Sequence, residues 1–293
     1  MKLIDPPLNI QTIDDLEQGF VVTHSVVEHD LLSPDGIVAL ADRLPGESAE
    51  PGLVGLVAEG GLDYEATPML DAGPAVRQLD GEAASLYLYN VERDPLFGSL
   101  LREILTGLTE RFGMGAGHIV DHEGYVFLTG GPATTSAHVD HEYNFLLVIR
   151  GRKRVFIADV PSVEGERALE ALHSGGYGAC DAVPDSGTVF EIGPGEGVFI
   201  PPRAAHYVEN GVEPCAALSV VFATESLRRE ARIYRVNALL RRLGLKPSPP
   251  GTNAMVDAAK SLFAQGVAPI RRGLRRVLRR TSKRARSLLG RHR

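Results

Sequence analysis

The chain has 293 residues, and its content of 44% hydrophobic and 23% charged residues is typical of a folded globular protein. No apolar run is long enough for a transmembrane helix, and we expect no secretory signal because the first residues lack an apolar core. The two cysteines, Cys180 and Cys215, are too few for a disulfide framework, so we expect a reducing, cytoplasmic location.

The charge of the chain is divided unevenly. Residues 271–293 hold eleven Lys and Arg and no acid, whereas the other 270 residues hold 20 basic and 37 acidic groups. Such a split marks a polar appendage rather than part of the fold. This basic tail fits a solvated segment on the acidic body, an amphipathic helix on an anionic membrane, or a contact with nucleic acid phosphates. It has no aromatic residue for stacking on bases, which disfavours single-stranded nucleic acid.

The N-terminal part contains few regular elements. Residues 1–30 indicate an extended lead-in with a strand near 19–23. Residues 33–44 are predicted to be a short helix, because Ser33 is a capping residue followed by proline in the first turn. Residues 45–80 are rich in Gly, Pro, Glu and Ala, which is typical of a surface loop or a substrate lid.

The central part is predicted to be mainly strand. Residues 85–89 alternate as a strand does, and apolar residues at helical spacing predict a helix over 94–112. The insertion 160–187, which contains His173, is expected to be a loop with substrate contacts. Four polar residues before the strand expected near 124–129 fit a solvated loop better than a metal site: His118, Asp121, His122 and Glu123. Further strands are expected near 124–129, 143–150, 153–159, 188–192, 197–200, 206–209 and 215–223.

These elements predict a mainly β fold with flanking helices. Many short strands separated by Gly and Pro turns favour a double-stranded β-helix, or jelly roll, within a domain of residues 1–224. The pattern changes to helical after Thr224. Residues 225–293 are therefore expected to form a C-terminal helical extension that ends in the basic tail.

Two separate runs of the sequence carry candidate metal ligands. His138 and Asp140 are two residues apart, so on a strand they point to the same face. His206 begins a later strand after a proline-bounded loop. Two imidazoles and one carboxylate form the set that non-haem Fe(II) enzymes use, although Mn or Ni would also fit it. The alternative is that both histidines are hydrogen-bonded core residues.

The run around His206 resembles the second conserved motif of the cupin family, G-x5-P-x-G-x2-H-x3-N. The matching residues are Gly195, Pro201, His206 and Asn210, with Arg203 in place of the second glycine.

The run around His138 keeps the spacing of the first cupin motif. His138, Asp140, Asn144 and Gly151 stand at its positions, but Asp140 and Asn144 replace a histidine and a glutamate. This replacement is similar to that of the JmjC and asparaginyl-hydroxylase branch of the cupins. Members of that branch also carry a lysine nine residues after the asparagine, a threonine three residues before the first histidine and an L-Y-L strand. The corresponding residues are Lys153, Thr135 and Tyr87.

The resemblance covers roughly residues 80–225 and implies a ligand set. Fe(II) would be bound by His138, Asp140 and His206. The far carboxylate of 2-oxoglutarate would be held by Lys153, Thr135 and Tyr87, with Asn144 at its near end. Val221 stands where asparaginyl hydroxylases often have a cosubstrate asparagine, and Ser219 on the same strand face is its expected stand-in.

Strand alternation gives a separate argument for Lys153. If Phe145, Leu147 and Ile149 share the inward face, Lys153 continues it beyond the turn at Gly151. A lone ammonium among apolar residues needs a counter-charge, which a dicarboxylate such as 2-oxoglutarate provides. The alternative is a solvated lysine in a turn.

The resemblance implies an Fe(II)- and 2-oxoglutarate-dependent oxygenase. Such an enzyme converts the cosubstrate to succinate and CO2 while it hydroxylates or demethylates a protein, a tRNA or a small molecule. The C-terminal helices of relatives commonly make a dimer contact, so we also expect a homodimer. Two alternatives remain open: a metal-binding cupin without 2-oxoglutarate, acting as an isomerase or a sensor, and a non-catalytic interaction protein that works through its C-terminus.

Overall fold

The chain forms two compact units. The first comprises Met1–Glu164 and Tyr177–Glu225, and the second comprises Gly165–Gly176 and Ser226–Arg293. The computed structural model describes residues 3–7, 10, 12, 17–44, 54–57, 76, 85–89, 91–114, 118–159, 165–174 and 185–266.

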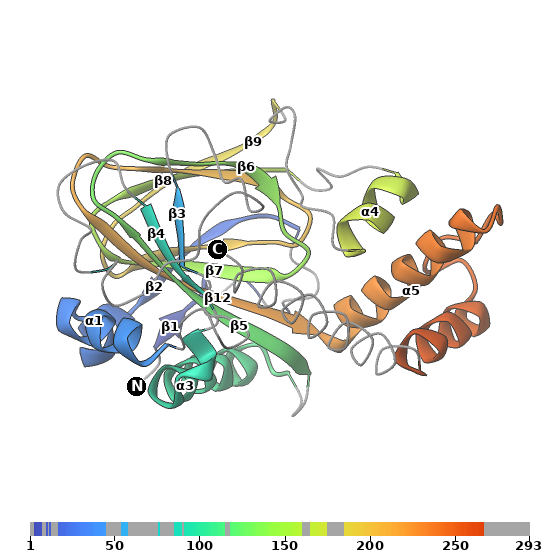
Figure 1. Ribbon diagram of the computed structural model, residues 1–293, viewed down its shortest axis with the longest axis horizontal. Coiled ribbons are helices and arrows are strands. Elements are labelled where there is room, and N and C mark those ends of the chain that lie inside the picture. Colours follow the sequence, from blue (N-terminus) through green and yellow to red (C-terminus); the bar gives the residue numbers. More distant parts are fainter. Residues whose placement is uncertain are drawn as a thin grey trace, which may run out of the picture. The chain divides into compact units, whose positions relative to one another are not determined.

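The first unit contains two antiparallel sheets (Figure 1). The larger sheet has the order β1 (Ile4–Asp5), β2 (Phe20–His24), β10 (Glu196–Ile200), β7 (Tyr143–Arg150), β12 (Cys215–Thr224), β5 (Ile119–Thr129), β4 (Ser85–Tyr89) and β3 (Val54–Val57). The smaller sheet has the order β6 (Thr134–Val139), β11 (Ala205–Asn210), β8 (Lys153–Ala158) and β9 (Gly187–Ile192).

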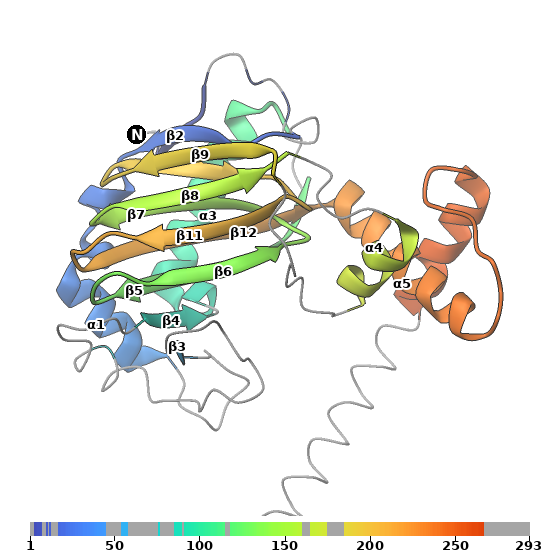
Figure 2. The same cartoon turned by 90° about the horizontal axis from the view of Figure 1, so that it is seen from above.

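The path of the chain from β5 to β12 is that of a double-stranded β-helix. Successive strands pass from one sheet to the other, apart from β8 and β9, which are neighbours in the smaller sheet. Figure 2 shows the smaller sheet lying across the larger one. The apolar core between the sheets includes Leu146, Val148, Val155, Ile157 and Val198. The predicted fold class is confirmed.

The helices of the first unit pack on the larger sheet, on the side away from the smaller one (Figure 1). They are α1 (Pro34–Arg43), α3 (Pro95–Arg111) and the 3-10 turns η1 (Val26–Glu28), η2 (Asp30–Leu32) and η3 (Val91–Arg93). A β-carbon added at Gly124 of β5 would lie 2.6 Å from the Leu101 side chain of α3, so a larger residue there would force that side chain to move.

Both predicted helix starts are confirmed. The Ser33 side chain accepts a hydrogen bond from the Gly36 amide at the start of α1, and proline follows each cap. Asp94 accepts hydrogen bonds from the amides of Leu96 and Phe97 at 3.1 Å. Its carboxylate also pairs with Arg43 of α1 at 2.6 Å, so one buried side chain fixes both helices.

Strand β5 is longer than the sequence indicates. It begins at Ile119, whereas the prediction placed its start near residue 124 and a loop before it. Asp121, His122 and Glu123 are strand residues that pair with β12. Acidic residues have low strand propensity, but the hydrogen bonds to β12 outweigh that preference here.

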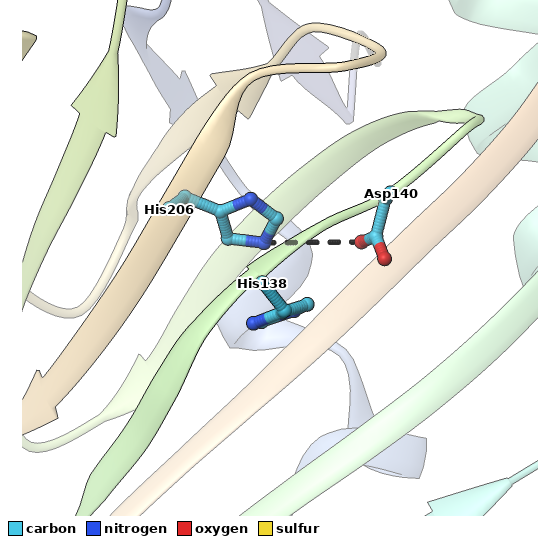
Figure 3. Close-up of side chains that lie close together, drawn as sticks. All are labelled: His138, Asp140 and His206. Carbon is cyan, nitrogen blue, oxygen red and sulfur yellow. Dashed lines mark ion pairs between the residues drawn. The ribbon is translucent and has the colours of Figure 1, made fainter. Parts of the chain in front are cut away.

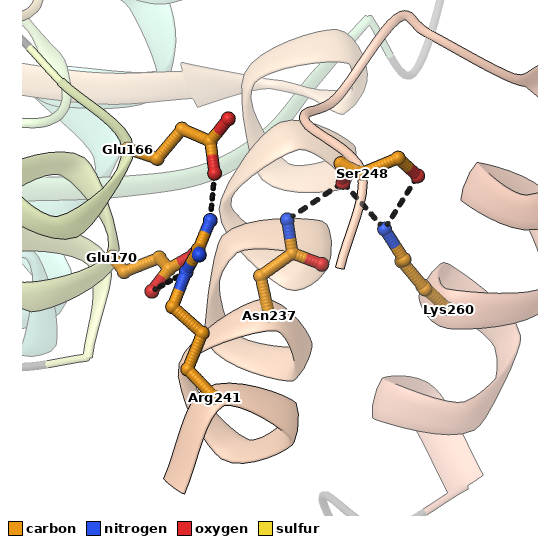
Figure 4. Close-up of polar contacts among 6 residues, drawn as sticks. All are labelled: Glu166, Glu170, Asn237, Arg241, Ser248 and Lys260. Carbon is orange, nitrogen blue, oxygen red and sulfur yellow. Dashed lines mark hydrogen bonds and ion pairs between the residues drawn. The ribbon is translucent and has the colours of Figure 1, made fainter. Parts of the chain in front are cut away.

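The second unit is helical and contains part of the predicted insertion. It holds α4 (Glu166–His173), most of α5 (Glu225–Arg242) and a helical segment at residues 254–266. Arg241 of α5 lies between Glu166 and Glu170 of α4, with 2.8 Å from its Nε to Glu170 (Figure 4).

The expectation that His173 belongs to a substrate loop is wrong. Its ring is buried and stacks on Tyr234 of α5 at a centroid distance of 5.2 Å. The apolar spacing of α4 drives it into the helical unit instead of leaving a loop.

Several predictions concern residues outside the described ranges. These are the basic tail 271–293, most of residues 45–80, and Cys180. Among the described helices, none combines the length and apolar character needed to span a membrane.

We predict that Asp94→Ala lowers the free energy of unfolding by about 2 kcal/mol, because it removes the α3 cap together with the pairing to Arg43. Urea denaturation measures the change. The control Asp35→Ala alters an exposed carboxylate in the first turn of α1. Equal destabilisation by the two substitutions would contradict the proposed role of Asp94.

Candidate functional site

A cavity of about 180 Å³ opens between the two sheets of the first unit. It contains all eight residues that the sequence indicated as site residues: Tyr87, Thr135, His138, Asp140, Asn144, Lys153, His206 and Ser219. Val221, the departure from the family pattern, also lines it.

The three candidate metal ligands lie together at one part of this cavity (Figure 3). Strands β6 and β11 pair with His138 opposite His206, and the ring centroids are 4.2 Å apart. Asp140 follows the end of β6, and its Oδ2 lies 3.8 Å from Nε2 of His206. One ligand atom from each residue lies within 4.8 Å of the others, and no other such group occurs within the described ranges.

Backbone contacts fix the orientation of both imidazoles. Nδ1 of His138 is 2.8 Å from the carbonyl of Ser136, and Nδ1 of His206 is 3.0 Å from the carbonyl of Ala204. A carbonyl can only accept, so both Nδ1 atoms carry a proton, and the Nε2 atoms are the ones available to bind a metal. Burial and the neighbouring His138 ring lower the pKa of His206 to about 4, which keeps it neutral.

A turn joins the two halves of this cluster. Arg203 has φ of +68°, the only positive value among the described residues other than glycine. It stands where the cupin motif has glycine, which adopts this conformation without strain. Its amide donates to the carbonyl of Asp140 at 2.8 Å, so the turn before β11 holds the backbone at the end of β6.

The donor set fits a divalent transition metal. Two imidazoles and one carboxylate on one side of an ion leave the other positions open. Ligand atoms about 2.1 Å from one ion are at most about 4.2 Å apart, so the cluster needs only a small contraction to bind.

Lys153 lies elsewhere along the same cavity and is buried, with 5% of its surface exposed. Its ammonium donates to Oδ1 of Asn210, whose amide nitrogen in turn donates to the carbonyl of Ala133 at 2.8 Å. Burial lowers the pKa of Lys153 to about 8. Within the described residues no carboxylate forms an ion pair with it, so the cavity contains an uncompensated cationic group.

Three hydroxyl groups and one amide add further polar groups to the cavity lining. The Tyr87 hydroxyl is 3.1 Å from that of Thr135, and burial raises the pKa of Tyr87, which therefore stays protonated. Ser219 is fully buried and donates to Oδ1 of Asn144 at 2.7 Å. The amide nitrogen of Asn144 is thereby left to donate to a ligand, so Ser219 orients Asn144.

The alternation argument for Lys153 assigned the wrong face of β7. Leu146 and Val148 face the core between the sheets, whereas Phe145 packs against Phe199 and Phe222 on the other side. The turn at Gly151 carries the chain from the larger to the smaller sheet, so the period of two does not continue across it. Lys153 still points into the cavity, as predicted.

Sequence reasoning missed Asn210 and an aromatic wall of the cavity that is formed by Tyr89, Tyr125 and Phe127. Tyr125 and Phe127 of β5 pair with Tyr89 and Tyr87 of β4, and their rings meet edge to face at 5.2 and 4.9 Å. The alternation of Tyr125, Phe127 and Thr129 was the available signal. Asn210 was noted as a motif position but not as a contact of Lys153.

Comparisons with known proteins give only distant likenesses. No family model matches the chain, and no curated protein matches it. An X-ray structure of E. coli ycfD has 16% identity and a TM-score of 0.47, with 88% of this chain and 64% of that chain covered. A structure of YcfD, a ribosomal oxygenase from Escherichia coli in complex with cobalt and 2-oxoglutarate, has 18% identity and a TM-score of 0.42, with 85% and 62% covered. This chain thus spans less than two thirds of these structures, and we base its function on its own site.

We predict that the chain binds one equivalent of Co(II) or Fe(II), and that His206→Ala lowers the affinity about 100-fold by removing one ligand. Anaerobic calorimetry measures both the number of metal ions bound and the affinity. His141→Ala is the matched control, because His141 pairs with Glu142 at 2.8 Å rather than joining the cluster. Unchanged metal affinity in His206→Ala would contradict the assignment.

Lys153→Met should raise the free energy of unfolding by about 1–3 kcal/mol at pH 7, because it removes a buried charge that has no carboxylate partner in the described part of the chain. The pKa of Lys153 is lower in the folded chain than in the unfolded one, so the charge destabilises the fold below pH 8. The gain should shrink as pH rises toward the unfolded pKa of about 10.4. Urea denaturation across this range measures it, and a loss of stability at pH 7 would contradict it.

Proposed function

We propose that the chain is an Fe(II)- and 2-oxoglutarate-dependent oxygenase that hydroxylates or demethylates its substrate. One observation carries the proposal: a two-histidine, one-carboxylate cluster shares one cavity with a buried lysine that has no carboxylate partner among the described residues. A keto acid that is also a dicarboxylate satisfies both groups at once.

His138, Asp140 and His206 would hold the metal through the two Nε2 atoms and a carboxylate oxygen. Bound iron supplies the activation of O2 that is coupled to conversion of 2-oxoglutarate into succinate and CO2. The task of the protein is to present these ligands from one side and to leave room for cosubstrate and O2 on the other.

The cosubstrate would lie between the metal cluster and Lys153. The ammonium would form a charge-assisted hydrogen bond with the far carboxylate, with the Tyr87 and Thr135 hydroxyls as further donors. The amide nitrogen of Asn144, oriented by Ser219, would donate to the near end. Asn210 would act through Lys153, whose ammonium it already contacts.

The aromatic wall would separate this cosubstrate from water. Tyr89, Tyr125 and Phe127 are contiguous rings on the larger sheet, and all three line the cavity. An apolar wall strengthens the electrostatic contacts inside the site.

Protein side chains, modified tRNA bases and small molecules are the substrate classes that the family resemblance implies.

Two finer assignments belong to the same proposal. The asparaginyl-hydroxylase-like branch is supported by the spacing of Asp140, Asn144 and Lys153. A reducing, cytoplasmic location is supported by Cys215, a buried free thiol.

A metal-binding cupin that does not use 2-oxoglutarate is the second candidate. Val221 favours it, because an apolar side chain lines the cavity where relatives place a polar contact to the cosubstrate. This candidate retains metal binding but predicts no affinity for 2-oxoglutarate.

An anaerobic titration with Fe(II) and 2-oxoglutarate separates the two candidates. We expect a weak visible charge-transfer band at about 500 nm, which arises when a keto acid chelates Fe(II). At low cosubstrate concentration the band should be lost in Lys153→Ala while the metal stays bound. Bound metal with no band in the unaltered chain would favour the second candidate.

The affinity for 2-oxoglutarate should depend on pH through Lys153, whose pKa is lowered to about 8. Below pH 8 the lysine is already charged, so affinity should be constant. Above pH 8 binding must take up a proton, and affinity should fall by about tenfold per pH unit. Calorimetry with a redox-inert metal measures this, and a flat profile between about pH 7 and 9.5 would contradict the role of Lys153.

A further inference from the structure

The helix at residues 254–266 in the second unit has most of its polar side chains buried and its large apolar side chains exposed. Asp257, Lys260 and Ser261 are buried, with at most 7% of their surface exposed. Met255, Leu262 and Phe263 are 84%, 67% and 53% exposed. A surface helix ordinarily shows the reverse pattern, so the outward face is suited to a partner that is not water.

Hydrogen bonds explain the inward orientation of the polar residues. Lys260 donates to the carbonyl of Ser248 at 2.7 Å, in the segment between α5 and this helix (Figure 4). Asp257 accepts from the Gly251 amide at 2.7 Å, and Ser261 binds Arg232 of α5 at 3.0 Å. The helix is therefore held in this orientation by specific contacts, which keep its apolar side facing out.

The outward apolar residues form a continuous strip. Met255 and Leu262 are seven residues apart, as are Val256 and Phe263, so the two pairs form adjacent rows along the helix. Leu239 of α5 and Leu243, directly after its end, are also exposed and lie four residues apart. Of the twelve exposed large apolar residues in the described part of the chain, seven belong to this unit.

The charge of the second unit identifies the partner. Residues 165–176 and 226–293 carry 20 basic and 4 acidic groups, a net charge of +16, whereas the first unit carries 11 basic and 33 acidic groups, a net charge of −22. Arg229, Arg242 and Lys246 are exposed on the same unit as the apolar strip. The partner must accept apolar side chains and be negatively charged.

We propose that the second unit binds the surface of an anionic phospholipid membrane, with the outward face of residues 254–266 in the headgroup region. Acyl chains take the apolar side chains and lipid phosphates take the basic ones. A nucleic acid accepts the charge but not the apolar strip. A second copy of the chain would cover the strip, but it would bring the +16 helical units of the two copies together. Repulsion between these like charges opposes association.

Vesicle flotation of the full chain tests this proposal. The chain should float with vesicles of phosphatidylcholine that contain about 30% phosphatidylglycerol, and should not float with phosphatidylcholine alone. About 0.5 M salt should weaken the binding, because it screens the phosphates. The triple variant Met255→Ser, Leu262→Ser, Phe263→Ser should lower the binding about tenfold or more.

The matched control is Leu96→Ser, Val120→Ser, Val212→Ser, which removes three exposed apolar side chains from the first unit and should leave flotation unchanged. Equal binding by the chain and its Met255/Leu262/Phe263 variant would overturn the proposal, as would no flotation with either vesicle. A dimer in light scattering that this variant converts to a monomer, without flotation, would assign the face to a second copy. Binding of an RNA oligonucleotide, unchanged in the variant and without flotation, would assign the charge to nucleic acid.

Discussion

The pairing of β6 with β11 is the contact on which the candidate site depends. It sets His138 opposite His206, although the two residues are 68 positions apart in the sequence. Asp140 reaches the same point because β6 ends one residue before it, where the amide of Arg203 holds its carbonyl. A slip of one residue in this register would turn one imidazole to the opposite face. Strand pairing and a single turn thus assemble a metal-ligand set from two distant motifs.

The polar groups at the two ends of the site differ in how well they are stabilised. The histidines are satisfied by backbone carbonyls, so the metal cluster needs little reorganisation. Lys153 has an amide oxygen as its partner but no carboxylate in the described chain, and its burial opposes its own charge. Such a group is costly to keep without a ligand and gains most from an anionic one. The free energy lost in burying Lys153 is therefore the physical basis of the proposed cosubstrate affinity.

Much of the fold was predictable because its signals are local. Alternating strands between Gly and Pro turns gave the β-helix, and Ser33 and Asp94 gave the two helix starts. The face of β7 was mispredicted because alternation stops at Gly151, where the chain changes sheets. The extension of β5 through Asp121 and the packing of His173 on Tyr234 depend on partners distant in sequence. The roles of Asn210 and Ser219 as partners of Lys153 and Asn144 likewise required coordinates, since no spacing rule links those strands.

In the proposed complex, one ligand contacts the metal cluster and Lys153 at the same time. Calorimetric titration of 2-oxoglutarate and of glutarate, each with and without a redox-inert divalent metal, tests it most directly. Glutarate carries the far carboxylate but lacks the keto group that chelates a metal. Metal should raise the affinity for 2-oxoglutarate by about tenfold or more, while the affinity for glutarate should change little. Equal affinity for 2-oxoglutarate with and without metal would contradict it.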